Sequence, residues 1–114
     1  MKIFVASGPV DMRKGFDGLS GVVRNILQAD PLSGHLFVFF NKRRNLAKVL
    51  WWDRSGFLIL YKRLQRGTFT VPVPSTPTSS VVRMRTSELM LILDGIDLRD
   101  AKRKSRYDYV CDSA

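Results

Sequence analysis

The residues with the clearest chemical potential are cations gathered in the middle of the chain. Lysine and arginine recur through residues 41–67, where Asp53 is the only acidic residue. Cations grouped in this way suit the neutralisation of phosphates, which supplies sequence-independent affinity for nucleic acids and makes that affinity depend on salt. The residues predicted to bind nucleic acid are Lys42, Arg43, Arg44, Lys48, Arg54, Lys62, Arg63 and Arg66.

Aromatic residues and a second pair of cations extend this prediction. Trp51, Trp52 and Tyr61 lie close in sequence to the basic residues, and aromatic rings beside cations can stack on unpaired bases. Adjacent residues of a strand point to opposite faces, so at least one Trp is expected in the core. The secondary candidates are Arg13, Lys14 and Trp52. The alternative is that Arg13 and Lys14 are solvated helix residues and that charge at residues 42–44 keeps a sheet soluble.

The sequence offers little material for catalysis or metal binding. His35 is the single histidine, and no cysteine or histidine lies at metal-ligand spacing from it. The acids are scattered singly, whereas hydrolysis or strand transfer on DNA needs carboxylates that share metal ions. We therefore predict no catalytic residue, no metal site and no cofactor. A small nuclease stays as an alternative that would require a close carboxylate pair.

Composition indicates which partners and which cellular compartment suit the chain. The 114 residues carry a formal net charge of +9 and a pI near 10.3, which favours a polyanionic partner such as DNA. Apolar runs are much shorter than the ~20 residues of a membrane span, so no membrane partner is expected. The lone thiol, Cys111, cannot form an internal disulfide. We expect a cytoplasmic protein.

The hydrophobic pattern predicts the elements that position these residues. Strands are expected at 3–6, 36–40, 47–52 and 57–62, with a further short strand at 68–71. A helix is expected over 11–28, with Asp11 as its N-cap. The connections between the middle strands are short, so these strands should pair as an antiparallel meander.

The second half of the chain is expected to be less regular. Residues 72–86 are rich in proline and hydroxyl side chains and are predicted to be a loop or linker. A short helix should follow over 88–94, capped by Ser87 and ended by Gly95. Residues 99–114 are expected to be a basic, disordered tail after a single domain of residues 1–98.

The resulting fold class is α+β, with an antiparallel β-meander of four to five strands packed against an N-terminal helix, and a short C-terminal helix. The strands are apolar on both faces, so the face away from the first helix needs a cover. The C-terminal helix, a second copy of the chain or a partner protein could provide it.

Three ordered blocks resemble the accessory transposition protein, TnpB or Orf2-like, of insertion-sequence family 66. They are Pro9–Leu19, then Asp30–Phe39 followed by Asn41–Arg44, and then Trp52-Asp53, Gly56-Phe57 and Tyr61–Leu64 with Gly67 and Phe69. The resemblance covers about residues 3–71, and Leu89–Leu98 is similar to the closing leucine-rich helix of that family. The chain departs from the family pattern in 72–86 and after Arg99.

This resemblance implies a non-catalytic accessory factor for DNA transposition. The partners it implies are a separate transposase encoded in the same element and, from the charge of the chain, DNA; a second copy of the chain is a further candidate. The alternative is a protein-interaction adaptor that docks on the transposase through an apolar sheet face without touching DNA.

Overall fold

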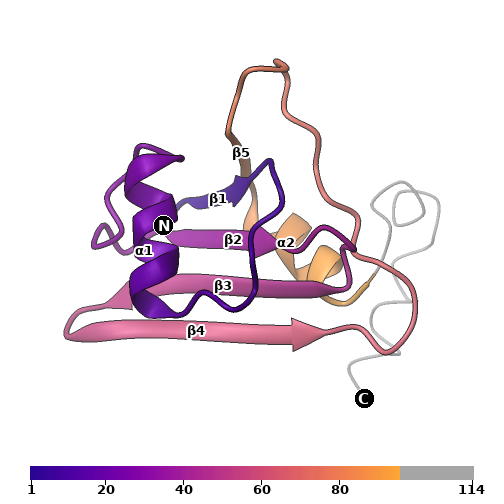
Figure 1. Ribbon diagram of the computed structural model, residues 1–114, viewed down its shortest axis with the longest axis horizontal. Coiled ribbons are helices and arrows are strands. Elements are labelled where there is room, and N and C mark those ends of the chain that lie inside the picture. Colours follow the sequence, from indigo (N-terminus) through magenta and orange to yellow (C-terminus); the bar gives the residue numbers. More distant parts are fainter. Residues whose placement is uncertain (96–114) are drawn as a thin grey trace.

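Five strands form one mixed sheet in the order β4-β3-β2-β1-β5 (Figure 1). The structure is a computed structural model, and it describes residues 1–95. The elements in chain order are β1 (Ile3–Ala6), α1 (Phe16–Asn25), β2 (Leu36–Phe40), β3 (Leu46–Asp53), β4 (Gly56–Arg63), β5 (Val81–Met84) and α2 (Thr86–Leu93).

The three middle strands form the predicted meander. β2 pairs antiparallel with β3, and β3 pairs antiparallel with β4. β1 instead runs parallel to β2, and β5 returns to pair antiparallel with β1. A parallel pair needs a long crossover connection, which residues 7–35 supply with α1 inside them. The α+β class and the meander are therefore confirmed, while β1 makes the whole sheet mixed rather than purely antiparallel.

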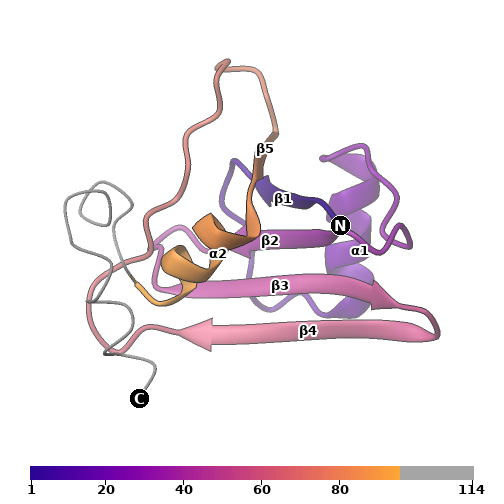
Figure 2. The same ribbon diagram turned by 180° about the vertical axis from the view of Figure 1, so that it is seen from behind.

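The sheet is covered on both faces, by α1 on one side and by α2 on the other (Figures 1 and 2). Phe37 and Phe39 of β2 belong to the apolar cluster that includes α1, whereas Val38 and Phe40 belong to the cluster that includes α2. All four are buried. The C-terminal helix thus supplies the second cover that strands apolar on both faces require.

The first helix is shorter than predicted, spanning Phe16–Asn25 in place of 11–28. Asp11 is not its N-cap, because its carboxylate accepts the backbone N–H of Arg13 at 2.9 Å and closes a tight turn. Gly15 occupies the N-cap position with φ −99° and ψ −149° and no side-chain cap. The run before Gly15 therefore forms a loop that crosses the sheet before the helix begins.

The predicted strand at 68–71 is absent from the described sheet. Phe69 is buried, and its ring lies 5.5 Å from that of Phe40 between centroids. Its backbone N–H donates to the carbonyl of Arg44. The alternating apolar pattern of this segment therefore reflects a loop that packs on the end of the sheet.

The predicted linker over 72–86 contains β5 and the start of α2. The prolines of this segment all precede Ser79, and they lie in the long connection that projects from the sheet (Figure 1). After them the β-branched pair Val81 and Val82 is free to pair with the edge of β1. The four residues of β5 lie between hydroxyl-rich and charged neighbours, and their hydrophobic pattern is too short to predict a strand.

The second helix begins two residues earlier than predicted, at Thr86, and ends at Leu93. Arg85, not Ser87, is the N-cap residue, and its backbone N–H donates to the Glu88 carboxylate at 3.2 Å. Gly95 has φ +80°, which confirms the glycine stop. The predicted basic tail, 99–114, lies outside the described residues.

Candidate nucleic-acid interface

The turn between β2 and β3 presents residues 42–44 on a braced backbone. The Asn41 carboxamide oxygen accepts the N–H groups of Asn45 at 3.0 Å and Leu46 at 2.9 Å. Its amide nitrogen donates to the Asn45 side chain at 2.7 Å. Arg44 adopts a left-handed conformation with φ 61°, and its N–H donates to the Asn41 carbonyl. The backbone that carries the exposed cations of this turn is therefore held in one conformation.

The segment after β4 is fastened to the same turn. The N–H of Leu64 donates to the Asn45 carbonyl at 2.9 Å, and the N–H of Phe69 donates to the Arg44 carbonyl at 2.6 Å. Residues 63–66 consequently lie beside the β2–β3 turn, although about 20 positions of sequence separate the two segments. We call this region the basic end; its exposed cations are Lys42, Arg43, Arg44, Arg63 and Arg66.

Acidic side chains do not neutralise the basic end within residues 1–95. The ion pairs of this part of the chain join Asp11 to Arg13 and Glu88 to Arg85. Neither pair involves a cation of the basic end. Unpaired cations that share one surface raise the local positive potential, which attracts polyanions from solution.

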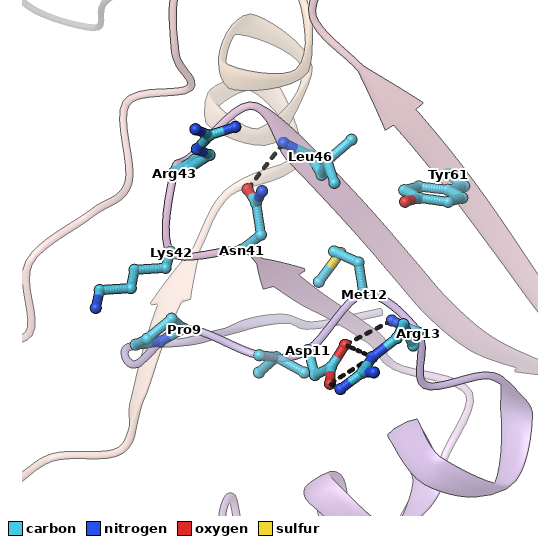
Figure 3. Close-up of a pocket in the computed structure, with 10 residues that line it drawn as sticks. Pro9, Asp11, Met12, Arg13, Asn41, Lys42, Arg43, Leu46 and Tyr61 are labelled. Carbon is cyan, nitrogen blue, oxygen red and sulfur yellow. Dashed lines mark hydrogen bonds and ion pairs between the residues drawn. The ribbon is translucent and has the colours of Figure 1, made fainter.

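A groove of about 520 Å³ opens beside the turn (Figure 3). The loop of residues 9–13 forms one wall, and it is held in place where the N–H of Val10 donates to the Phe40 carbonyl at 2.9 Å. The turn carrying Lys42 and Arg43 forms the opposite wall, and Tyr61 of β4 lines the groove as well. Segments from three separate parts of the sequence therefore shape this groove.

Asp11 and Arg13 form a tight pair on the loop wall of the groove. The guanidinium of Arg13 donates to both carboxylate oxygens, with a shortest distance of 2.7 Å. These hydrogen bonds, the backbone N–H of Arg13 and the attraction of the opposite charge lower the pKa of Asp11 from 3.8 to about 2. The charge of Arg13 is therefore largely compensated at neutral pH, which weakens its case as a phosphate ligand.

We expect this pair to persist across the physiological range and to fail only in acid. A carboxyl whose pKa is lowered by folding stabilises the native state above its unfolded pKa, and that contribution disappears as the pH falls from about 4 to about 2. Carbon-detected NMR titration of Asp11 should give a pKa of about 2 in the native chain and a clearly higher pKa in Arg13→Ala, which loses the guanidinium but keeps the backbone N–H of residue 13. An unchanged titration in the variant would exclude Arg13 as the cause.

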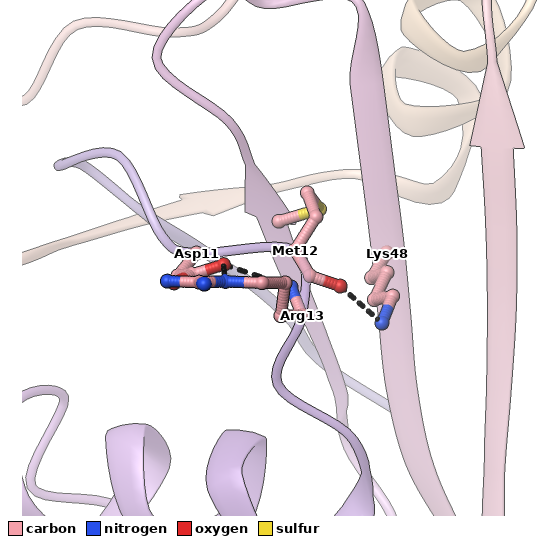
Figure 4. A network of polar contacts seen from close by, with 4 residues as sticks. All are labelled: Asp11, Met12, Arg13 and Lys48. Atoms are coloured by element: carbon pink, nitrogen blue, oxygen red, sulfur yellow. Dashed lines mark hydrogen bonds and ion pairs between the residues drawn. The ribbon is translucent and has the colours of Figure 1, made fainter.

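Lys48 has a structural role that its sequence position did not reveal. The residue is buried, and its ammonium donates to the Met12 carbonyl at 2.7 Å (Figure 4). It also donates to the Lys14 carbonyl at 2.8 Å. The same ammonium lies 4.6 Å from the centroid of the Tyr61 ring. Lys48 thus ties the loop of residues 12–14 to β3, and a phosphate outside the protein would have to displace these bonds. Lys14 itself is exposed beside this anchor.

Three predicted residues do not present their side chains at the basic end. Arg54 occupies the turn between β3 and β4 at the opposite end of an eight-residue strand pair, roughly 25 Å away. Trp52 is near that turn, with its ring 5.0 Å from Phe57 in an edge-to-face contact. Lys62 pairs with Ala47, whose side chain belongs to the cluster on the α2 face, so Lys62 points to that face.

Sequence reasoning missed two features of the surface. Asn41 braces the basic turn, and the only signal was an asparagine at each end of a charged triplet. A hollow of about 590 Å³ at the other end of β1 gathers Lys2, Arg83 and Arg85. Arg83 lies on β5 and Arg85 is the N-cap of α2, and both elements begin within the predicted linker. Because Glu88 pairs with Arg85, this second basic group is partly neutralised.

The described residues do not form a metal-binding site. No group of three histidine, cysteine or acidic side chains able to hold a metal ion occurs in residues 1–95. The Nδ1 atom of His35 accepts the N–H of Lys2 at 3.0 Å, and its ring packs edge-on against Phe4, so His35 serves to hold β1 beside β2. Over the same residues, no helix is both long and apolar enough to cross a bilayer.

Comparison with known proteins gives one family. A family model described as "IS66 Orf2 like protein" matches residues 1–103. The match includes residues 72–86, the segment that departs from the motifs of the family. The uncharacterized protein y4jC of Sinorhizobium fredii is 36% identical over 104 residues, covering 91% of this chain and 86% of y4jC. The uncharacterized protein y4hO of the same organism is 36% identical over 99 residues, covering 87% and 84%. No solved structure matches.

Proposed function

Because this chain belongs to the family of IS66 Orf2 like proteins, we propose that it is a non-catalytic accessory factor of transposition that binds DNA through its basic end. Its partners would be DNA and the separate transposase of the same element, in the cytoplasm. The transposase would supply the carboxylates and metal ions of strand transfer. This chain would hold DNA or position the transposase on it.

The observation that carries the proposal is the convergence of exposed cations from two segments of the chain. The β2–β3 turn contributes Lys42, Arg43 and Arg44, and the segment after Tyr61 contributes Arg63 and Arg66. Each phosphate contact adds about 0.9 to the slope of log affinity against log salt concentration on duplex DNA. Five contacts would give a slope between about −4 and −5.

Fluorescence anisotropy with a labelled duplex tests this function. Affinity should fall steeply and linearly, on logarithmic axes, between about 50 and 200 mM salt. Binding that is absent at low salt, or that does not change with salt, would contradict a phosphate-based interaction. An unrelated duplex of the same length should bind about equally well, because phosphate contacts carry no sequence information.

A second candidate function is docking on the transposase, and a specific observation favours it. Leu58 and Leu60 of β4 are 43% and 51% exposed, and they share a face with Trp51 and Val49 of β3. Within residues 1–95 no strand pairs with the outer edge of β4. An exposed edge strand with apolar side chains is a typical site for pairing with another chain.

The docking function makes its own prediction. Replacing Leu58 and Leu60 together by Ser should reduce capture of the purified transposase at least about ten-fold, since each buried leucine contributes on the order of 1.5–3 kcal/mol. DNA affinity should stay the same, because neither residue lies at the basic end. A matched double variant, Phe16→Ser on α1 with Ile26→Ser at the C-cap of that helix, removes similarly exposed apolar groups elsewhere. Equal capture by both double variants would argue against docking at β4.

A further inference from the structure

We propose that the groove beside the basic end binds an unpaired nucleotide of single-stranded DNA, with its base stacked on Tyr61. This inference rests on the proposed function and deepens it, because it names the form of DNA that the site takes. Its central feature is an exposed aromatic ring that is held in place between two hollows lined by cations.

Tyr61 is placed to meet a ligand from either hollow. It lines the groove of about 520 Å³ beside the turn, and it also lines a neighbouring hollow of about 560 Å³ with Arg63 and Gln65. The residue is 54% exposed although it lies within a strand. Leu46 lines both hollows, so the two form a continuous shallow surface with the tyrosine between them.

The ring is held in one orientation before any ligand arrives. Tyr61 lies opposite Lys48 in the β3–β4 register, and the Lys48 ammonium is 4.6 Å from its ring centroid. That ammonium is fixed in turn by the carbonyls of Met12 and Lys14. A ring already ordered by its neighbours loses little conformational entropy when a base stacks on it.

Cations line the two hollows on either side of the ring. Arg63 lies two residues further along the same face of β4, about 7 Å from Tyr61. Lys42 and Arg43 line the groove on the turn side (Figure 3). Aromatic stacking combined with flanking phosphate contacts is the usual chemistry of single-strand binding.

Duplex DNA could not use the ring in this way. Paired bases are stacked on each other and present only their edges in the grooves, so a protein aromatic reaches a base face only where pairing is broken. The other aromatic candidate, Trp52, packs on Phe57 far from the basic end. Tyr61 is therefore the aromatic residue of the described sheet that lies among the cations of this surface.

The test compares single-stranded and duplex probes of the same sequence, with 2-aminopurine replacing one adenine of the single strand. Tyr61→Leu should weaken single-strand binding about ten-fold, the loss typical of one stacked base, and should leave duplex affinity unchanged. Tyr61→Phe, which keeps the ring, should bind like the native chain. Trp52→Leu removes an aromatic residue at the opposite end of the hairpin and should have no effect on single-strand binding. Native protein should quench the 2-aminopurine, and Tyr61→Leu should not.

Each result separates this inference from the proposed function. Salt-dependent duplex binding together with equal single-strand affinity in Tyr61→Leu would overturn the stacking site and leave the accessory DNA-binding role intact. An equal loss on both probes would also overturn stacking, because it would indicate a change in the surface as a whole. Failure of both probes to bind the native chain at low salt would overturn the DNA-binding function and this inference with it.

Discussion

Removing the charge of the β2–β3 turn should abolish most of the DNA affinity at low salt. In the triple variant Lys42→Ala, Arg43→Ala, Arg44→Asn, three phosphate contacts are lost, so the salt slope should decrease by about 2.7 in magnitude. At about 50 mM salt this corresponds to a loss of affinity on the order of 1,000-fold, taking about 1 M salt as the point where phosphate contacts contribute nothing. Asparagine is chosen at Arg44 because φ is 61° there and asparagine tolerates the left-handed region.

A matched variant separates position from total charge. Lys2→Ala, Arg24→Ala, Arg54→Asn removes the same number of exposed cations from sites away from the basic end, with asparagine at Arg54 because φ is 55° there. Anisotropy over the same salt series should give this control a slope close to that of the native chain. If both triple variants lose affinity equally, binding depends on the overall charge of +9 and the basic end has no special role.

Replacing Lys48 should have the largest effect on stability of any single substitution at this surface. Lys48→Met keeps an unbranched side chain of similar length but removes the donor that serves the carbonyls of Met12 and Lys14. A buried acceptor left without a partner costs about 1–3 kcal/mol, and the Met12 carbonyl is buried while the Lys14 carbonyl is partly buried. We expect the free energy of unfolding to fall by about 2–4 kcal/mol, and the midpoint of thermal unfolding by roughly 10 °C or more.

Denaturant unfolding followed by tryptophan fluorescence measures this change. Lys62→Met is the control, since Lys62 lies on the neighbouring strand, points to the other face and has a side chain that makes no hydrogen bond within residues 1–95. Its effect should stay within about 0.5 kcal/mol, as for most surface substitutions. Equal stability of Lys48→Met and the native chain would mean that water satisfies both carbonyls and that the anchor is dispensable.

The predictable part of the fold is the part encoded by local pattern. Three apolar runs joined by short turns specify β2, β3 and β4, because strand pairing between sequence neighbours follows from turn length. The position of β1 could not be read in this way. Its pairing with β2 and β5 depends on which face α1 covers, and no local spacing in Ile3–Ala6 records that choice.

The candidate site was predictable in its charges and not in its geometry. The triplet Lys42–Arg44 stands out by composition. Its proximity to Arg66 depends on hydrogen bonds that the backbone N–H groups of Leu64 and Phe69 donate to carbonyls of the turn. The burial of the Lys48 side chain could not be predicted from the sequence for a related reason. A lysine in an apolar strand looks like a surface residue until a crossing loop brings backbone carbonyls to it, and that loop follows from the mixed topology of the sheet.

Mapping DNA contacts residue by residue tests the central claim most directly. Amide shifts recorded by NMR while a short oligonucleotide is titrated into the labelled chain should change at residues 9–14, 41–46 and 61–66. Amides near Arg24, Arg54 and the exposed part of α2 should stay unchanged. Changes centred on Lys2, Arg83 and Arg85, or spread evenly over the surface, would contradict a DNA site at the basic end.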